Sequence, residues 1–331
     1  MCQTELHSNH NYRSVVGGKG LRLSALAGSR DPTRTTQLRN SFVAELDRRF
    51  RHLRQLIYKA IVEEDVFGLK PITALQTPGP RAFDFTTSSQ KVSAFMEWLD
   101  RQVKDGMLTV IDSTQVGESV NGAWSNKYIQ DSYGRGVARA RQQLRRGGLV
   151  IPPLSESGGL AAAFATPIHA DRLGLLFTRV YSDLKGITDS MDSLISRVLA
   201  QGIADGTGPL TIARQINGVI SATGGSLNMT DTLGRFIPAA RRARIMARTE
   251  IIRAHAEAQL QEYANWGVEG VTMDVELVTA GDDRVCQQCT GLAAGGPYTI
   301  EQARGMIPVH GQCRCAWIPN ITDELKRGRR G

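Results

Sequence analysis

The chain of 331 residues has few aromatic side chains, few cysteines and no long apolar run. Aromatic residues make up only 6% of it, so a hydrophobic core has to come mostly from Leu, Ile, Val and Ala. No apolar stretch approaches the length that a membrane-spanning helix needs. The first residues lack the basic and then apolar segments of a secretory signal. We therefore expect a protein of the reducing cytoplasm with no membrane anchor.

The common signatures of enzymes are also missing. The sequence has no G-x-S-x-G elbow, no Walker loop, no dinucleotide fingerprint and no HExxH motif. The glycine-rich stretch at 17–20 does not have the spacing of a phosphate-binding loop. His52, His169 and His255 fall in separate predicted helices, and we interpret them as surface or core histidines. The sequence therefore names no catalytic residue.

Positive charge is plentiful and unevenly placed, with a net charge of +8. The segment from Arg34 to Lys59 contains seven basic and two acidic residues. The segment from Arg235 to Arg253 contains six arginines and one acidic residue. Such segments suit nucleic acid or an acidic protein surface, or are solvated helix faces with local ion pairs. The candidate contact residues are Arg48, Arg49, Arg135, Arg139, Arg241, Arg242 and Arg244.

Apolar residues recur every three or four positions through most of the chain, which predicts a predominantly helical protein. The predicted helices lie at about 31–65, 91–107, 124–146, 168–206, 211–220 and 238–267. In the fourth of these, the seam from Val180 to Val198 suits a coiled coil or packing within the monomer, and we favour the second. In the last, Ile252 and Tyr263 mark the buried stripe, while Glu250 is expected on the opposite side.

A different pattern follows at 271–319. An alternating β-branched strand precedes "GDDRVCQQC", a short helix is expected at 299–306, and "CRCAWIPNI" reads as a second strand. A unit of this size cannot bury enough apolar surface without a staple. The predicted fold class is α+β and predominantly helical, with a long-helix N-terminal body and a small C-terminal zinc-stapled α/β unit.

Four of the five cysteines lie in this unit. Cys286 and Cys289 form a CxxC pair, and His310, Cys313 and Cys315 form HxxCxC about twenty residues later. Two closely spaced ligand pairs of thiolate and imidazole suit a tetrahedral zinc ion. The first choice of ligands is Cys286, Cys289, His310 and Cys313, and Cys315 is able to replace either of the last two.

A structural zinc is favoured over a catalytic one, because these soft ligands suffice to close the coordination sphere. The alternatives are a redox dithiol at the CxxC pair or simply buried free cysteines. A thioredoxin-like site requires the motif at a strand-to-helix junction of a βαβ unit, and the sequence shows no such unit.

The Arg-Thr-Glu of the last helix (Arg248, Thr249, Glu250), Asp283-Arg284 before the CxxC, and the closing Pro-x-His-x-x-Cys-Arg-Cys occur together. Over roughly 205–318 this combination resembles the phage head morphogenesis family, the Mu F-like minor capsid proteins. We assign Arg248 and Glu250 structural roles, with Arg248 partly buried and holding its helix to the following sheet.

The resemblance implies a non-enzymatic minor head protein that associates with the portal, the scaffold or the major capsid protein during procapsid assembly. It implies a virion or procapsid location, reached from the host cytoplasm, and contact with phage DNA. The rival is a zinc-knuckle nuclease or DNA-processing enzyme, although no second CxxC staple or His-Asn-His set is found. The predicted division is an arm (1–30), a helical domain (31–147), a linker (148–166), a head-morphogenesis-like domain (167–319, with a zinc-knuckle subdomain at 271–319) and a basic tail (320–331).

Overall fold

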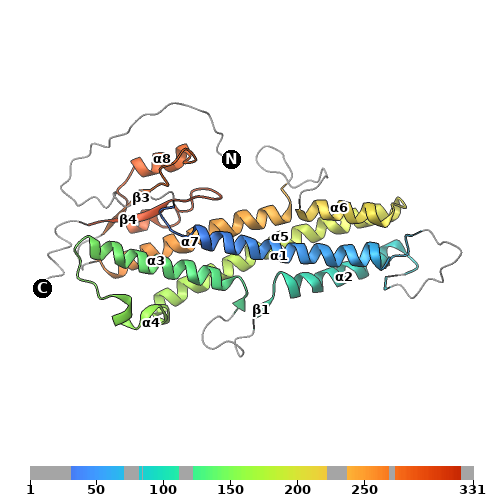
Figure 1. Cartoon of the computed structure of the whole chain (residues 1–331), viewed down its shortest axis with the longest axis horizontal. Helices are drawn as coiled ribbons and strands as arrows, with labels where there is room; N and C mark the ends of the chain where they lie inside the picture. Colours follow the sequence, from blue (N-terminus) through green and yellow to red (C-terminus); the bar gives the residue numbers. More distant parts are fainter. Residues whose placement is uncertain are drawn as a thin grey trace. The chain divides into compact units, whose positions relative to one another are not determined.

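The computed structural model describes most of the chain (Figure 1). The described residues are 31–70, 82–83, 85–111, 122–221, 237–267 and 273–321. The predicted N-terminal arm and nearly all of the predicted basic tail lie outside them. The chain divides into two compact units built from separated segments. Unit 1 comprises Met1–Asn40, Lys127–Leu176 and Arg248–Gly331, and unit 2 comprises Ser41–Asn126 and Phe177–Ala247.

The predicted helical fold with a small C-terminal sheet is confirmed. The main helices are α1 (Thr36–Tyr58), α2 (Ser88–Gly106), α3 (Asn126–Arg146), α5 (Pro167–Ala204), α6 (Pro209–Ser221) and α7 (Ala239–Asn265). The shorter ones are η2 (Lys59–Glu63, a π-helical turn), η4 (Leu154–Ser157, a 3₁₀ turn), α4 (Gly159–Ala165), α8 (Gln287–Ala294) and α9 (Ile300–Ala303). The segment interpreted as a linker thus contains η4 and α4. None of the helices in the described ranges has the length and apolar character needed to cross a membrane.

Two antiparallel pairs of strands complete the described part of the chain. The strands are β1 (Val110–Ile111), β2 (Gly122–Ala123), β3 (Asp274–Val278) and β4 (Ala316–Asn320). In the second pair, Val275 lies opposite Pro319 and Leu277 lies opposite Trp317. Val275 and Leu277 are buried and their neighbours in β3 are partly exposed, which matches the alternation seen in the sequence.

The core of unit 2 is formed by apolar faces of α1, α2 and α5 together with a small aromatic group. The rings of Phe67 and Phe95 lie 5.3 Å apart. The indole of Trp124 donates a hydrogen bond of 2.8 Å to the Met107 carbonyl and carries the Arg49 guanidinium 4.0 Å above its ring. Phe95 lies inside α2, whereas Phe67 and Trp124 lie outside the helices.

Unit 2 also contains a largely buried carboxyl group, one oxygen of which accepts no hydrogen bond within the described residues. One oxygen of Asp192 in α5 is buried without a hydrogen-bond partner in the described structure. Burial, followed by the charges of Asp100 and Asp189, raises the pKa of Asp192 to about 7 from its ordinary value of 3.8. The folded protein therefore holds a proton on this group at pH values where the unfolded chain has lost it. Stability contributed by this group falls as pH rises from about 4 to about 7 and is constant above that range.

The variant Asp192→Asn should remove this dependence. We expect it to gain about 2 kcal/mol of unfolding free energy at pH 8, roughly half of the full value for such a shift because the side chain is partly exposed. At pH 4 the gain should be close to zero. Urea unfolding of both proteins at several pH values measures the difference, and a gain that is the same at every pH would contradict the assignment.

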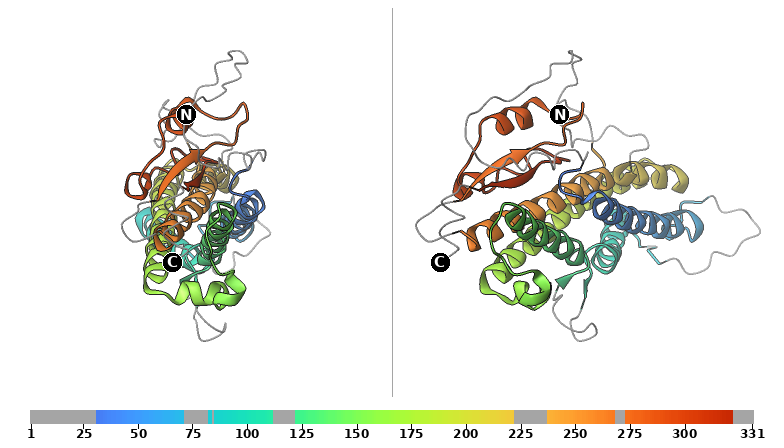
Figure 2. Two further views of the ribbon diagram at one scale, coloured as in Figure 1. Left: turned by 90° about the vertical axis from the view of Figure 1, so that its left-hand side faces the viewer. Right: turned by 60° about the vertical axis from the view of Figure 1, so that its left-hand side comes forward.

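Unit 1 is layered. The β3–β4 sheet lies between α8 and the helices α3 and α7 in every view (Figures 1 and 2). A single hydrophobic cluster spans these layers, and it includes all four cysteines of the C-terminal segment. Trp317 of β4 is fully buried at its centre. The cysteine-rich unit therefore shares its core with the helices and does not form a separate one.

A buried polar network fastens the sheet to the helices of unit 1. The Tyr263 hydroxyl of α7 donates a hydrogen bond of 2.6 Å to the Gln143 side-chain oxygen of α3. The Gln259 amide donates to the Trp317 carbonyl at 3.0 Å, and the Trp317 backbone N–H donates to the Gln259 side-chain oxygen at 3.3 Å. Each partner satisfies a polar group that burial would otherwise penalise.

The expectation of a single buried stripe on α7 is wrong. Glu250, expected on the opposite side, is 2% exposed and pairs with Arg253 at 3.1 Å. His255 is completely buried, and burial lowers its pKa to about 4. The helix is covered by α3 on one side and by the sheet layer on another, so polar residues on several faces are enclosed. Helical periodicity alone cannot reveal a second covering layer.

Candidate metal centre

The first cysteine pair sits at the beginning of a helix that the sequence did not predict. Cys286 is the N-cap of α8, and its Sγ accepts a hydrogen bond of 3.5 Å from the Cys289 backbone N–H. The two cysteines therefore flank the first turn of α8, and both are buried. The preceding strand β3 pairs antiparallel with β4, so the CxxC pair does not lie in a βαβ unit.

The second group of candidates approaches from the loop before β4. Cys313 and Cys315 are buried, whereas His310 is half-buried. The His310 Nε2 atom lies 3.4 Å from the Cys289 Sγ, and its Nδ1 atom lies 2.8 Å from the Gly311 carbonyl oxygen. The loop and the start of α8 thus bring all five sequence-predicted candidates to one place.

The ligand atoms form two overlapping groups that could hold a metal ion. One group is Cys286, Cys289 and His310, the other is Cys289, Cys313 and Cys315, and within each the atoms lie within 4.8 Å of one another. A tetrahedral zinc with Zn–S bonds of about 2.3 Å holds its sulfur atoms about 3.8 Å apart. All four cysteines are free thiols. The donor set therefore fits a metal ion of the zinc type with only small adjustments.

The ionisation of the thiols points the same way. Burial, followed by the charge of Cys313, raises the pKa of Cys289 to about 12. A hydrogen bond with Cys315 is the main cause that lowers the pKa of Cys313 to about 5. That same contact, together with burial, raises the pKa of Cys315. A bound metal ion would stabilise the thiolate form of cysteines placed this close together.

Charged side chains brace the turn before the first cysteine pair. Arg314, between Cys313 and Cys315, donates two hydrogen bonds of 2.6 Å to the two carboxylate oxygens of Asp282. Arg284 adds a third at 2.9 Å. Hydrogen bonding to Arg314 is the main cause that holds the pKa of Asp282 well below its usual range. A bidentate Arg–carboxylate pair of this kind fixes the two cysteine segments to each other.

Arg248 and Thr249 of α7 contact the backbone segment that carries the second cysteine pair. Arg248 donates a hydrogen bond of 2.8 Å to the side-chain oxygen of Gln312, and the Gln312 backbone N–H donates to the Thr249 hydroxyl at 3.3 Å. Gln312 has a φ of 67°, and it immediately precedes Cys313. These contacts explain why the helix motif and the cysteine motif occur together: α7 holds the backbone that presents the second cysteine pair. Sequence reasoning missed Gln312 and Asp282.

The arginine candidates of α1 take part in local pairs. Arg48 and Arg49 both bind Glu45, at 2.6 and 2.8 Å. Arg49 also donates to the Gly106 carbonyl and stacks on Trp124. Arg49 therefore serves the fold of unit 2, and Arg48 remains the more exposed of the two, with 61% of its side chain accessible.

The candidates of α7 divide in a similar way. Arg244 forms an ion pair with Asp47 at 2.6 Å, and Arg242 is half-buried and donates to the Ile187 carbonyl at 3.3 Å. Burial lowers the pKa of Arg242. Arg241 is exposed. Arg135 and Arg139 of α3 differ from the other candidates because they line a cavity, which is described below.

The fold and the centre define a helical protein that carries a small cysteine-rich α/β unit able to hold a metal ion. Residues 193–318 match the model of the family described as Phage Mu protein F like protein. The match extends from the second half of α5 to β4 and includes the whole cysteine cluster. The resemblance to a phage head morphogenesis family is thereby confirmed. No curated protein and no solved structure matches the chain.

Proposed function

We propose that the protein is a non-enzymatic minor head protein that associates with the portal and the procapsid during phage head assembly. The observation that carries this proposal is the family match over 193–318, because it covers α7 and the metal centre as one connected unit. The Arg248 and Thr249 contacts with Gln312 support it, since they make the family's motifs parts of a single scaffold. Scaffold and major capsid proteins are further partners in this proposal, and the assembled virion or procapsid is the proposed location.

The experiment is a deletion of the gene from the phage with complementation in trans. We expect defective heads or a loss of infectivity on deletion, rescue by the wild-type chain, and co-purification of a tagged chain with portal protein from procapsids. Normal heads with normal infectivity in the deletion phage would contradict the proposal. Protein found with portal but not with mature virions would restrict the role to assembly.

We infer that the cysteine cluster holds one structural zinc ion. Supporting this are the two overlapping ligand groups, the burial of all four cysteines and the hydrogen bonds that fix their two segments. When bound, zinc would staple the start of α8 to the loop before β4. Nothing in the cluster requires the open coordination position of a catalytic zinc.

Metal analysis of the purified full chain should find about one zinc per molecule. Chelation should lower the melting temperature, because zinc binding to the folded chain contributes directly to its stability. The variants His310→Ala, Cys313→Ser and Cys315→Ser compare the three residues that compete for the last two places. The variants that lose zinc identify the ligands, and a metal-free wild type that melts at the same temperature as the loaded protein would contradict a structural zinc.

We propose contact with phage DNA as a second property, through arginines whose side chains are exposed. Arg48, Arg241 and Arg244 are exposed on α1 and α7, and Arg135 is exposed on α3. Contacts to phosphates give binding that weakens steeply with salt. A filter-binding series from 50 to 300 mM salt should therefore show a steep decline, and salt-independent binding would contradict phosphate contacts.

A further inference from the structure

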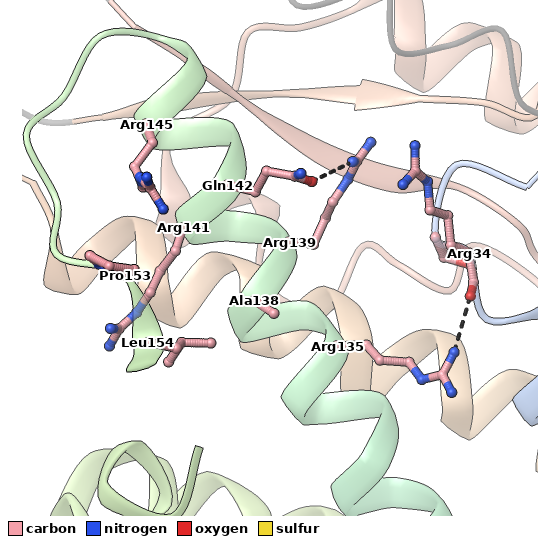
Figure 3. A pocket seen from close by; sticks show the side chains of 10 residues that line it. Arg34, Arg135, Ala138, Arg139, Arg141, Gln142, Arg145, Pro153 and Leu154 are labelled. Carbon is pink, nitrogen blue, oxygen red and sulfur yellow. Dashed lines mark hydrogen bonds between the residues drawn. The ribbon is translucent and has the colours of Figure 1, made fainter. Parts of the chain in front are cut away.

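The outer face of α3 carries a cavity whose lining is rich in arginine. It has a volume of about 440 Å³. Arg135, Arg139, Arg141 and Arg145 reach it from successive turns of α3, and Arg34 reaches it from the segment before α1 (Figure 3). All lie in unit 1. None of the described residues that line the cavity is acidic.

Part of this positive charge is left without an acceptor. The Nε atom of Arg139 and the Nη1 atom of Arg141 are buried and have no hydrogen-bond partner within the described structure. The Arg141 Nε atom is already bound to Glu262 at 3.0 Å, and Arg139 donates from Nη1 to Gln142 at 3.1 Å. Buried guanidinium N–H groups without an acceptor are costly, so these side chains carry charge that the fold compensates incompletely.

The positive charges of neighbouring arginines also repel one another. Burial lowers the pKa of Arg139, and the neighbouring charge of Arg34 lowers it further. Arg135 donates a hydrogen bond of 3.4 Å to the carbonyl oxygen of Arg34, so the two segments meet at the cavity (Figure 3). An anion placed between these guanidinium groups would relieve the repulsion and accept hydrogen bonds from their accessible N–H groups.

Size and lining narrow the class of anion. A volume of about 440 Å³ falls within the range of roughly 300–1,000 Å³ seen for sites that bind small organic ligands. Pro153 and Leu154 give the cavity an apolar side close to Arg141 and Arg145 (Figure 3). Guanidinium groups match the oxygens of phosphate in a bidentate geometry. A ligand that combines phosphate with an uncharged organic part fits both sides.

We propose that this cavity binds the phosphate of a nucleotide-sized ligand, with the organic part against Pro153 and Leu154. Two sources share this chemistry: a free nucleotide, and the phosphorylated end of a single nucleic-acid strand. This proposal is independent of the proposed role in head assembly, because all the residues that line the cavity lie in unit 1 and the family match is not needed for it. It also differs from the proposed contact along a DNA duplex, which uses exposed arginines and needs no cavity.

The test is a set of binding titrations on the full chain by calorimetry. The probes are ADP, adenosine, and a single-stranded hexanucleotide with and without a 5′-phosphate. ADP should bind saturably and adenosine should not, because the phosphates supply the acceptors. The double variant Arg135→Gln/Arg139→Gln should bind ADP at least about tenfold more weakly.

A charge-matched control separates the cavity from general attraction. Arg51 and Arg101 are exposed arginines of unit 2 that do not line the cavity. The variant Arg51→Gln/Arg101→Gln should keep its ADP affinity within about twofold, since it loses the same charge far from any specific contact. If the cavity double variant fails to fold, Arg145→Gln, at an exposed position, provides the same comparison with a smaller loss.

Each outcome decides the proposal. Binding of the hexanucleotide that requires its 5′-phosphate and falls in the cavity variant assigns the nucleic-acid end as the source. Binding of ADP alone, with the same dependence, assigns a free nucleotide. No saturable binding of ADP or hexanucleotide, or an equal loss in the cavity and control variants, would overturn the proposal.

Discussion

Replacing Cys289 with serine should abolish zinc binding and destabilise unit 1 more than any other single change in the cluster. Cys289 is the only residue common to the two ligand groups found in the described structure, and it is 2% exposed. Structural zinc contributes its binding free energy to folding, so the loss should exceed about 3 kcal/mol. Metal analysis gives the zinc content, and urea unfolding gives the change in stability. Hydrogen exchange should locate the loss of protection in 273–321.

The chain contains a matched control for this substitution. Cys2 lies far from the cluster in the sequence, and Cys2→Ser removes the same thiol chemistry. That variant should keep about one zinc per chain and the wild-type unfolding midpoint. Adding a chelator should lower the midpoint of the wild type and of Cys2→Ser, and it should not change Cys289→Ser any further. A Cys289→Ser protein that still holds one zinc per chain would refute the shared ligand position.

The sequence was sufficient for the cysteine centre because its signal is local. The spacings of Cys286, Cys289, Cys313 and Cys315 are those of short turns, and the strand before them follows a simple alternation. The capping of α9 by Thr299 was likewise readable from the sequence, and the structure shows the complete capping box with Gln302. Signals of this kind need no knowledge of what packs against them.

Several features that sequence reasoning missed depend on contacts between distant segments. Gln312 carries no motif, and its role appears only when α7 places Arg248 and Thr249 beside it. The arginine cavity depends on Arg34, which lies about one hundred residues before its partner Arg135. The two compact units alternate along the chain, and composition gives no sign of that. The predicted domains are continuous ranges of the chain and stay a prediction. The two compact units are each built from separated segments, so their boundaries differ from the predicted ones.

The role of Gly136 in α3 also depends on a contact that the sequence does not reveal. The sequence indicates only that Gly136 weakens its helix, because glycine is a poor helix former. In the structure, a Cβ atom at this position would lie 2.5 Å from the His255 carbonyl oxygen and 2.6 Å from the Ala258 Cβ atom. Both obstacles belong to α7 and sit on or next to its backbone, so they cannot move aside as a flexible side chain does. Gly136 is therefore the residue that lets α3 and α7 pack closely.

The variant Gly136→Leu should lower the free energy of unfolding by about 3 kcal/mol or more, because a side chain at this point forces two helices apart. Gly186 in α5 is the matched control, since a Cβ atom there would meet nothing within 4 Å and the position is exposed. Gly186→Leu should be neutral or gain up to about 1 kcal/mol from better helix propensity. Urea unfolding of the two variants measures the contrast. Equal midpoints would show that α3 and α7 can separate at little cost. A selective loss in Gly136→Leu would instead show that the close packing of α3 on α7 contributes to the stability of unit 1.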